Sequence, residues 1–284
     1  MDDVAGPIGA AVGESWLSTL DLNAAFDRPW VDAALEWLLT GAAEVDATDV
    51  GCGAGGAACA LARRAEVATV VAVDRDARLM EVAQRRAATE GVAAEVRWAR
   101  GEVGRLPLRP GSLDLVWASG VVHHVADQQA AVDELAALLR PGGALALVEG
   151  GLPLRCLPHD VGVGRPGLEA RLDEARARWI DDLRAELGGP SLPYGWPEAL
   201  ARAGLRSMRT RSYIAEATSP LDDIGRRIAR QHLVSARDEL GERLDPDDRA
   251  TVGRLLDLDD PASIDHRDDL TVTTVRTVHM ATAP

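Results

Sequence analysis

The chain has 284 residues, 46% of them hydrophobic, and a formal net charge of -14. A chain of this length can bury a sizeable core, and it has no unbroken apolar run of about 18 residues, so a transmembrane span is excluded. The negative charge argues against nucleic-acid binding, which needs clustered cations to neutralise phosphates, and against attraction to an anionic membrane surface.

The N-terminus and the cysteines indicate a reducing compartment. Residues 1–13 carry acids at their start and no basic segment, so they do not match a secretory signal peptide. The three cysteines, Cys52, Cys59 and Cys156, lack the spacing of metal ligands. We therefore expect free thiols in a cytoplasmic protein.

The glycine-rich segment Gly51 to Gly56 follows a short predicted strand, Val45 to Val50, and precedes helix-forming sequence, Ala57 to Arg64. Glycines let a ligand approach the backbone closely, and a helix N-terminus attracts negative charge. The next predicted strand, Ala68 to Val73, ends at Asp74, a carboxylate that can accept both hydrogen bonds of a ribose diol. The segment therefore predicts a binding site for a nucleoside with a free ribose.

This loop alone does not decide which nucleoside binds. Gly51, Gly53 and Gly56 also satisfy the dinucleotide fingerprint, with an acid at about the expected distance of ~20 residues. A nicotinamide-dependent oxidoreductase therefore stays open at this point. A non-catalytic module that only binds the cofactor is a second alternative.

The following segments carry further motifs in a fixed order. In chain order they are a third strand Val96 to Ala99, the turn Gly101-Glu102-Val103, the Leu106-Pro107-Leu108 segment, a fourth strand Ser112 to Trp117, His123-His124-Val125-Ala126-Asp127, an amphipathic helix, Leu138 to Gly143, and a fifth strand Ala144 to Val148.

With these motifs, residues 45–150 closely resemble the class I S-adenosylmethionine-dependent methyltransferases, in particular the small-molecule branch that includes quinone C-methyltransferase-like enzymes. The resemblance implies an α/β fold with a doubly wound, seven-stranded, mostly parallel sheet and helical cap insertions. It also implies S-adenosyl-L-methionine as the cofactor and methyl transfer as the reaction.

The resemblance also implies roles for single residues in cofactor binding. Gly51 and Gly53 would pack against the methionine part of the cofactor, Asp49 would order that end, and Asp74 would hold the ribose hydroxyls. On the adenine side, Glu102 stands where the family more often has Asp, and Val103 would supply a backbone amide. Ser119 would lie near the methionine end.

Catalytic candidates come from the ends of the fourth and fifth strands, which face the crevice in such sheets. These ends nominate His123, His124 and Glu149. We expect Glu149, and after it His124, to accept a proton from an acceptor such as a phenol, an amine or an activated carbon. No Asp, Asn or His set has the spacing of a metal site, so we expect metal-independent transfer.

The remaining segments complete the predicted organisation. Residues 1–43 predict one or two lid helices before a cofactor-binding core at 44–150. Residues 151–196 predict a cap insertion with a helix opened by Pro166 and ended by Gly188 and Gly189. Trp196-Pro197 is predicted to open a short helix, and residues 197–284 predict a sixth strand at Leu205 to Ala217, a helical insertion at 218–268 and a seventh strand at Val272 to Met280.

The acceptor is expected to be a small, aromatic or hydrophobic molecule, such as a specialised metabolite. Trp16, Tyr194 and Trp196 are candidates to stack on it, and Arg165 is a candidate to hold a carboxylate. A quinone- or lipid-like acceptor is the alternative. The sequence predicts no nucleic-acid or membrane partner, and it leaves the oligomeric state and the methylated atom open.

Overall fold

The computed structural model describes residues 14–190 and 192–284. These residues form two compact units. We call them the sheet unit, residues 14–151, 189–213 and 276–284, and the helical unit, residues 152–188 and 214–275. Each unit is described separately below.

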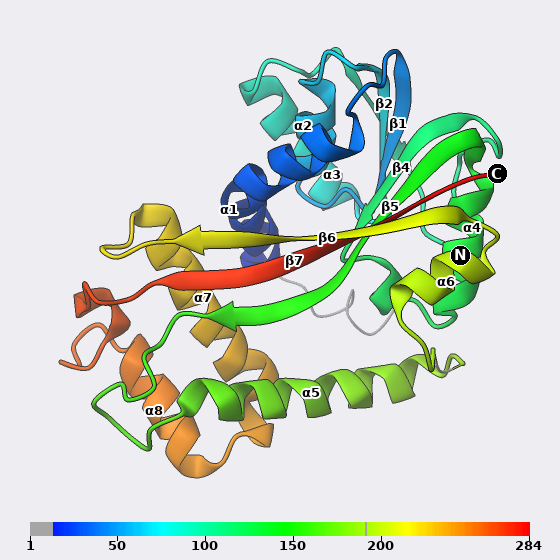
Figure 1. The fold of residues 1–284 in the computed structure, drawn as a ribbon. Coiled ribbons are helices and arrows are strands. Elements are labelled where there is room, and N and C mark those ends of the chain that lie inside the picture. Colours follow the sequence, from blue (N-terminus) through cyan, green and yellow to red (C-terminus); the bar gives the residue numbers. More distant parts are fainter. Residues whose placement is uncertain (1–13, 191) are drawn as a thin grey trace. The chain divides into compact units, whose positions relative to one another are not determined.

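Within the described part of the chain, seven strands form one sheet with the order β3-β2-β1-β4-β5-β7-β6 (Figure 1). The strands are β1 Val45–Val50, β2 Val67–Asp74, β3 Val96–Arg100, β4 Leu113–Ser119, β5 Leu139–Arg155, β6 Arg206–Ala217 and β7 Val272–Thr282. Strand β1 has β2 on one side and β4 on the other, so the chain reverses its direction of winding there. Open α/β sheets bind ligands at the carboxyl ends of the strands at such a point.

Most of the sheet is parallel. Strands β2 and β3, β1 and β2, β1 and β4, and β4 and β5 pair in parallel. Strand β7 runs the other way, because Ala283 bonds back to Gly143 and His279 lies opposite Thr210. The predicted α/β fold with a mostly parallel, seven-stranded sheet is confirmed.

Strand β5 differs from its prediction. We expected it to begin at Ala144 and end at Val148, but it covers Leu139–Arg155. The pairing with β4 shifts between Leu113↔Leu139 and Leu115↔Ala144, so residues 140–143 form a bulge. Proline and glycine are rare inside strands, so the sequence favoured a loop at residues 140–143. The bulge explains why the strand can contain them.

The helices were predicted more closely. The expected helix after Asp127, the short helix at Trp196, helices within the insertion at 218–268 and the helix ended by Gly188 are all present. Residues 1–43 contain a single described helix, with Pro29 inside it. The α-helices are α1 Glu14–Leu38, α2 Gly56–Ala62, α3 Ala77–Thr89, α4 Gln128–Ala137, α5 Leu168–Leu187, α6 Trp196–Arg202, α7 Asp223–Leu240 and α8 Pro246–Leu256; the 3-10 helices are η1 Val122–His124, η2 Gly241–Arg243 and η3 Ile264–His266.

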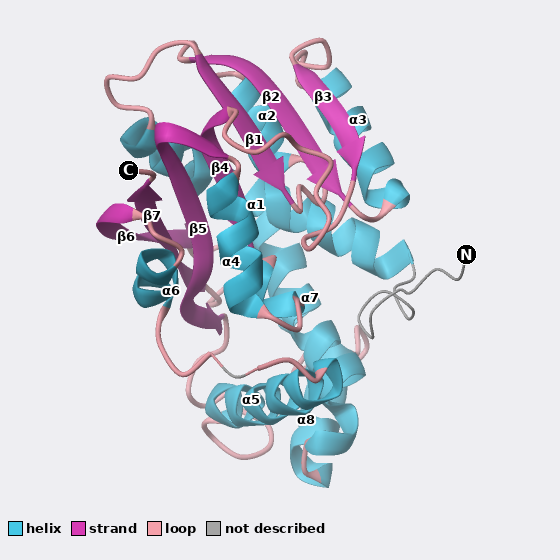
Figure 2. Ribbon diagram, turned by 90° about the vertical axis from the view of Figure 1, so that its right-hand side faces the viewer, coloured by secondary structure: helices cyan, strands magenta, loops and turns pink. Residues whose placement is uncertain are grey.

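In the sheet unit the helices form two groups. Helices α1, α2 and α3 contact one another, as do α4 and α6, and Figure 2 shows these groups on opposite faces of the sheet. The core between them is apolar, with Leu35, Trp117 and Leu147 fully buried. Thr48, also fully buried, is satisfied because its hydroxyl donates to the carbonyl of Val71 at 2.7 Å. None of the described helices has the length and apolar character that crossing a membrane requires.

In the helical unit, α5 packs against α7, and α7 packs against α8. Helix α5 buries Leu168, Leu172 and Ala175 and ends at Gly188, which adopts a left-handed conformation with φ 66°. Glycine is favoured there because it has no Cβ to strain this conformation.

Candidate functional site

The glycine loop after β1 is held against the end of β2. The amides of Gly51 and Cys52 donate to the carbonyl of Val73 at 2.8 and 3.0 Å. Gly51 has a φ of 70°, and a Cβ on it would lie 2.3 Å from Cγ2 of Val121. A Cβ on Gly55 would lie 2.7 Å from Cβ of Ala83. At these two positions only glycine fits without displacing a neighbour.

Gly53 is surrounded differently. With a φ of 51°, it has open space where a Cβ would stand, and the nearest atom is Cδ1 of Leu20 at 3.9 Å. Three residues on, a Cβ on Gly56 would lie 2.9 Å from Cβ of Ala24. Leu20 and Ala24 both belong to α1, so this helix lies directly against the glycine loop.

Asp74, at the end of β2, supports the loop. Its side chain is 7% exposed, and one carboxyl oxygen accepts the amide of Gly53 at 2.9 Å while the other accepts the amide of Asp76 at 2.9 Å. Burial raises the pKa of Asp74, and these two hydrogen bonds act in the opposite direction. Each oxygen keeps a second lone pair for a ligand hydroxyl.

Asp49 is the most unusual group of the site. It is 2% exposed, and its Oδ2 has no hydrogen-bond partner among the described residues. Burial raises its pKa to about 7, opposed by a hydrogen bond from the amide of Ala58 and reinforced by the charge of Asp74. A buried carboxyl oxygen without a partner is costly, so this position favours a ligand that donates a hydrogen bond or carries positive charge.

The raised pKa of Asp49 predicts a pH effect on the ligand-free protein. Because the folded pKa of about 7 lies above the reference value of 3.8, stability should fall as pH rises through this interval. The slope is at most about 1.4 kcal/mol per pH unit for one group. Asp49→Asn should therefore raise the melting temperature at pH 8 and have little effect at pH 4, measured by calorimetry. Exposed Asp181→Asn is the control, and an equal response in both variants would contradict the assignment.

Glu149, at the end of the parallel part of β5, holds the turn that follows β4. Its side chain is 3% exposed, and Oε1 accepts the amides of Val121 and Val122 at 2.9 and 2.7 Å. Its Oε2 lies 2.7 Å from Nδ1 of His123. This pairing fixes the His123 ring, whose side chain is 47% exposed. If Nδ1 carries the proton that is shared with Glu149, Nε2 is left as a proton acceptor.

His124 has a different environment from its neighbour. Its ring lies 3.8 Å from the His123 ring, and its buried Nδ1 finds no hydrogen-bond partner in the described part of the chain. Burial, together with the neighbouring His123, lowers the pKa of His124 to about 4. The ring is therefore neutral near pH 7 and a weak base.

The predicted adenine-side residues follow β3. Gly101 donates its amide to the carbonyl of Asp74 at 3.0 Å, which brings Glu102 and Val103 beside the end of β2. Glu102 is half exposed and forms an ion pair with Arg105 at 3.3 Å. Ser119 is the last residue of β4 and pairs with Val148. The predicted cofactor residues thus lie at one edge of the sheet, formed by the carboxyl ends of β1 to β4.

The predicted acceptor residues are not all gathered at this edge. Tyr194 donates its hydroxyl to Gln129 at 3.0 Å, and both Tyr194 and Trp196 pack on the apolar core beside α4 and α6. In the helical unit, Arg165 pairs with Asp245 and Asp248. Trp16 belongs to the first turns of α1, but its side chain lies outside the described residues.

A buried aromatic cluster adjoins the site. Trp117 on β4 pairs in register with Asp49, so both side chains lie on the face that α1 covers. Trp117 stacks on Trp30 of α1 at 6.0 Å, and Tyr213 of β6 lies 6.3 Å from Trp30. The Trp117 indole nitrogen makes no hydrogen bond among the described residues, whereas the Trp30 indole lies beside the Asp27 carboxylate and the Tyr213 hydroxyl beside Arg211. Trp30 and Trp117 are 4% and 0% exposed, so their rings are part of the core between α1 and the sheet.

Sequence reasoning ranked His124 above His123 and did not find the link from Glu149 to the turn. The two adjacent histidines do not indicate which ring contacts Glu149, because the direction of each ring depends on the conformation of the short helix η1. The presence of an acid at the end of β5 was the only available hint.

The site fits S-adenosylmethionine. Asp74, the open space at Gly53 and the unpartnered Oδ2 of Asp49 lie along one edge, and Asp49 suits a cationic ligand group. These features match a nucleoside whose other end carries positive charge.

Comparison with known proteins agrees with this geometry. Residues 48–147 match the family described as "Methyltransferase domain". The chain is 35% identical over 127 residues to an uncharacterized methyltransferase of Mycobacterium tuberculosis, covering 43% of this chain and 61% of that protein. It is 30% identical over 128 residues to the ubiquinone/menaquinone biosynthesis C-methyltransferase UbiE of Dinoroseobacter shibae, covering 45% of this chain and 51% of that protein. The chain thus spans between half and two thirds of the length of these two curated relatives.

A crystal structure of a putative methyltransferase from Bacillus halodurans is similar in fold, with a TM-score of 0.56 and 15% identity, over 89% of this chain and 98% of that one. The likeness covers the sheet with its flanking helices, and the family match covers the strands that carry the site. Residues 48–147 thus form a methyltransferase domain of the class I, S-adenosylmethionine-dependent type, and S-adenosylmethionine is the cofactor that this domain supports.

Proposed function

We propose that the protein transfers a methyl group from S-adenosylmethionine to a small, largely apolar acceptor, and that His123 removes a proton from it. The observation that carries the proposal is the edge formed by Asp49, the glycine loop and Asp74, next to the Glu149–His123 pair. Val121 joins the two parts, because it contacts Gly51 and donates its amide to Glu149.

The proposed cofactor contacts follow from the free atoms of each residue. Asp74 accepts the ribose hydroxyls, Asp49 accepts from the ammonium of the methionine end, and Glu102 with Val103 contacts the adenine. The bound cofactor supplies a sulfonium methyl group that is already electrophilic. The protein therefore needs mainly to hold the acceptor in line with it, and such positioning contributes on the order of 7 to 11 kcal/mol in favourable models.

Proton removal is assigned to His123 because of its hydrogen bond to Glu149. A carboxylate that accepts Nδ1–H fixes the tautomer and leaves Nε2 free to accept a proton. His123 is half exposed, whereas Glu149 has both oxygens bonded to protein donors and His124 is buried. Glu149 thus acts through His123 as a positioning residue, and the earlier preference for Glu149 as the base itself is not supported by its contacts.

A small acceptor is supported by the position of α1. Leu20 and Ala24 lie against the glycine loop, so the cofactor edge is covered on this side and offers little room for a macromolecule. A quinone-like acceptor is the second candidate, favoured by the similarity to the quinone C-methyltransferase.

Asp74→Asn tests the cofactor site. The variant loses a charge-assisted acceptor, which is worth about 1.5 to 3 kcal/mol, so the Kd for S-adenosylhomocysteine should rise ~10- to 100-fold. Titration calorimetry measures this, with Asp76→Asn as the control because asparagine also caps helices well. Affinity equal to wild type would place the nucleoside elsewhere, and a thermal shift with NADH instead of S-adenosylhomocysteine would favour the oxidoreductase alternative.

The acceptor proposal is tested by product detection. The protein is incubated with S-adenosylmethionine and a panel of phenols, quinols, amines and fatty acids, and methylated products are identified by mass spectrometry. We expect a product from the aromatic members of the panel. Efficient methylation of an intact protein or RNA would overturn the proposal, and cofactor binding without product across the panel would favour a non-catalytic module.

A further inference from the structure

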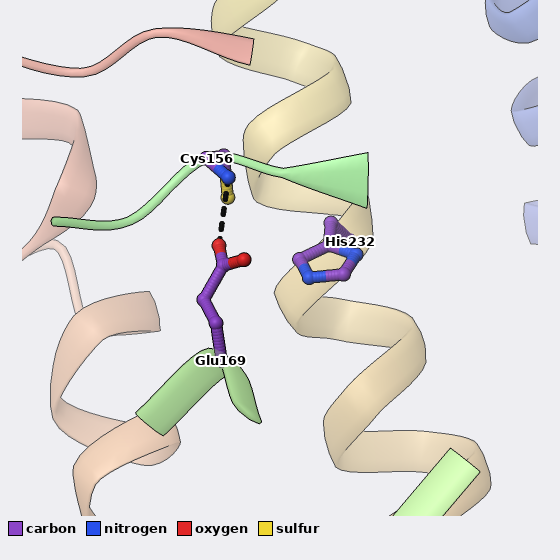
Figure 3. A group of neighbouring side chains, drawn as sticks. All are labelled: Cys156, Glu169 and His232. Atoms are coloured by element: carbon purple, nitrogen blue, oxygen red, sulfur yellow. Dashed lines mark hydrogen bonds between the residues drawn. The ribbon is translucent and has the colours of Figure 1, made fainter. Parts of the chain in front are cut away.

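The helical unit contains a second cluster of chemically active side chains, far from each other in sequence. Cys156 follows the end of β5, Glu169 lies in the first turn of α5, and His232 lies in the middle of α7. Their Sγ, carboxyl oxygen and ring nitrogen atoms lie within 4.8 Å of one another (Figure 3). We call these residues the Cys156 cluster.

Two backbone amides hold Glu169 in place through one oxygen, and its other oxygen makes no hydrogen bond within the described residues. Its Oε1 accepts the amides of Cys156 and Leu157, each at 2.7 Å. Its Oε2 is buried and makes no hydrogen bond within the described residues, and Figure 3 shows it on the side of His232. The Glu169 side chain is 9% exposed, and the cation paired with its Oε2 is the guanidinium of Arg155, whose Nε lies 3.5 Å away without forming a hydrogen bond. A buried carboxyl oxygen of this kind needs a partner.

We propose that Cys156, Glu169 and His232 bind a divalent transition-metal ion, with Zn²⁺ as the ion that this set of ligands favours.

The ligand types determine the choice of ion. Zn²⁺ accepts thiolate sulfur, imidazole nitrogen and carboxylate oxygen, whereas Ca²⁺ and Mg²⁺ require oxygen ligands. Zinc–ligand bonds of about 2.0 to 2.3 Å place tetrahedral ligand atoms roughly 3.5 Å apart, so small side-chain rotations are needed to close the site. Three protein ligands leave the fourth position for water.

The surrounding charges permit a cation. Nε of Arg155 lies 3.5 Å from Oε2 of Glu169, and its positive charge opposes the binding of a cation there. Arg155 also pairs with Asp173, which offsets part of this charge. Arg176, which also lies near His232, pairs with Glu239 at 3.5 Å. When the ion binds, the Cys156 thiol releases its proton to solvent and a sulfur–metal bond replaces the S–H bond. Thiolate and carboxylate together then balance the charge of the ion.

A metal site explains this cluster better than a nucleophilic cysteine does. Cys156 is 4% exposed, and burial raises the pKa of its thiol, so an accessible thiolate is not available for attack on a substrate. A bound cation favours the thiolate without exposing it. The ion would also join the end of β5 to α5 and α7 and so stabilise the helical unit.

The test uses the full chain, treated with chelator and then titrated with Co²⁺ and Zn²⁺. We expect one ion per chain, a thiolate-to-cobalt charge-transfer band in the near ultraviolet that Zn²⁺ abolishes, and a higher melting temperature with Zn²⁺. Cys156→Ser should remove the band, and Glu169→Gln or His232→Asn should weaken binding at least ~10-fold. The matched controls, buried Cys59→Ala and exposed His266→Asn, should keep wild-type binding.

A measurement on the wild-type protein covers the case in which the variants do not fold. X-ray absorption at the zinc edge should reveal one sulfur among the ligands of the bound ion. The absence of a charge-transfer band in the wild type, a band retained in Cys156→Ser, or a zinc shell with only nitrogen and oxygen would each overturn the proposal.

Discussion

Glu149→Gln is expected to reduce turnover by about 10² to 10⁴-fold while the protein stays folded. Glutamine can accept the amides of Val121 and Val122 through its carbonyl oxygen, so η1 keeps its support. Its amide nitrogen, however, donates to Nδ1 of His123, which moves the ring proton to Nε2 and removes the proton acceptor. Steady-state kinetics measures the loss, which should fall on kcat because the cofactor contacts are unchanged.

Glu149→Ala separates the two roles of this residue. Removing the carboxylate leaves the amides of Val121 and Val122 without their acceptor, and each unsatisfied buried amide costs about 1 to 3 kcal/mol of unfolding free energy. His123→Asn should reproduce the kinetic loss with little loss of stability, because the ring is half exposed. If Glu149→Gln and His123→Asn both turn over like the wild type, positioning alone drives transfer and the pair is structural.

Gly51→Ala is expected to weaken S-adenosylhomocysteine binding by about 100-fold or more, equal to ~2.7 kcal/mol. The new Cβ would stand 2.3 Å from Cγ2 of Val121, so either the glycine loop or the turn after β4 has to shift. Since Val121 also donates its amide to Glu149, the shift should reach the catalytic side of the site as well.

Gly111→Ala is the matched control for this variant. Gly111 has a similar φ of 66°, but nothing lies within 4 Å of its Cβ position. Both variants therefore carry the backbone strain of about 1 to 2 kcal/mol, and only Gly51→Ala carries the clash. Titration calorimetry and thermal melts compare the two. Equal cofactor affinity in both would mean that the loop after β1 does not contact the cofactor.

The cofactor edge was predictable because its signals are local. The strand, the glycines and Asp74 lie close together in sequence, and each residue type is required by backbone geometry. The start of β5 was predicted wrongly because Pro141 and Gly142 resemble a loop, and only the pairing with β4 and β7 reveals the bulge. Such pairing joins segments that are distant in the sequence, so the spacing of residues along the chain does not indicate it.

The side-chain partners were less predictable for the same reason. Which of the two histidines contacts Glu149 depends on the conformation of the short helix η1. Two adjacent histidines in the sequence do not indicate which ring it will be. The Cys156 cluster joins three segments, with a loop between Cys156 and Glu169 and with α6 and β6 among the elements between Glu169 and His232, so no ligand spacing marks it in the sequence. Predicted roles for Trp16, Arg165, Tyr194 and Trp196 stay predictions, because aromatic or cationic character alone does not determine which surface a residue serves.

The packing of α1 on the glycine loop has a consequence for the speed of the catalytic cycle. Since Leu20 and Ala24 lie against Gly53 and Gly56, we expect exchange of spent for fresh cofactor on this side to involve a movement of α1. Such gating motions take microseconds to milliseconds and often limit turnover. Pre-steady-state kinetics should then detect a rapid first turnover followed by a slower steady rate, set by departure of S-adenosylhomocysteine instead of by bond formation.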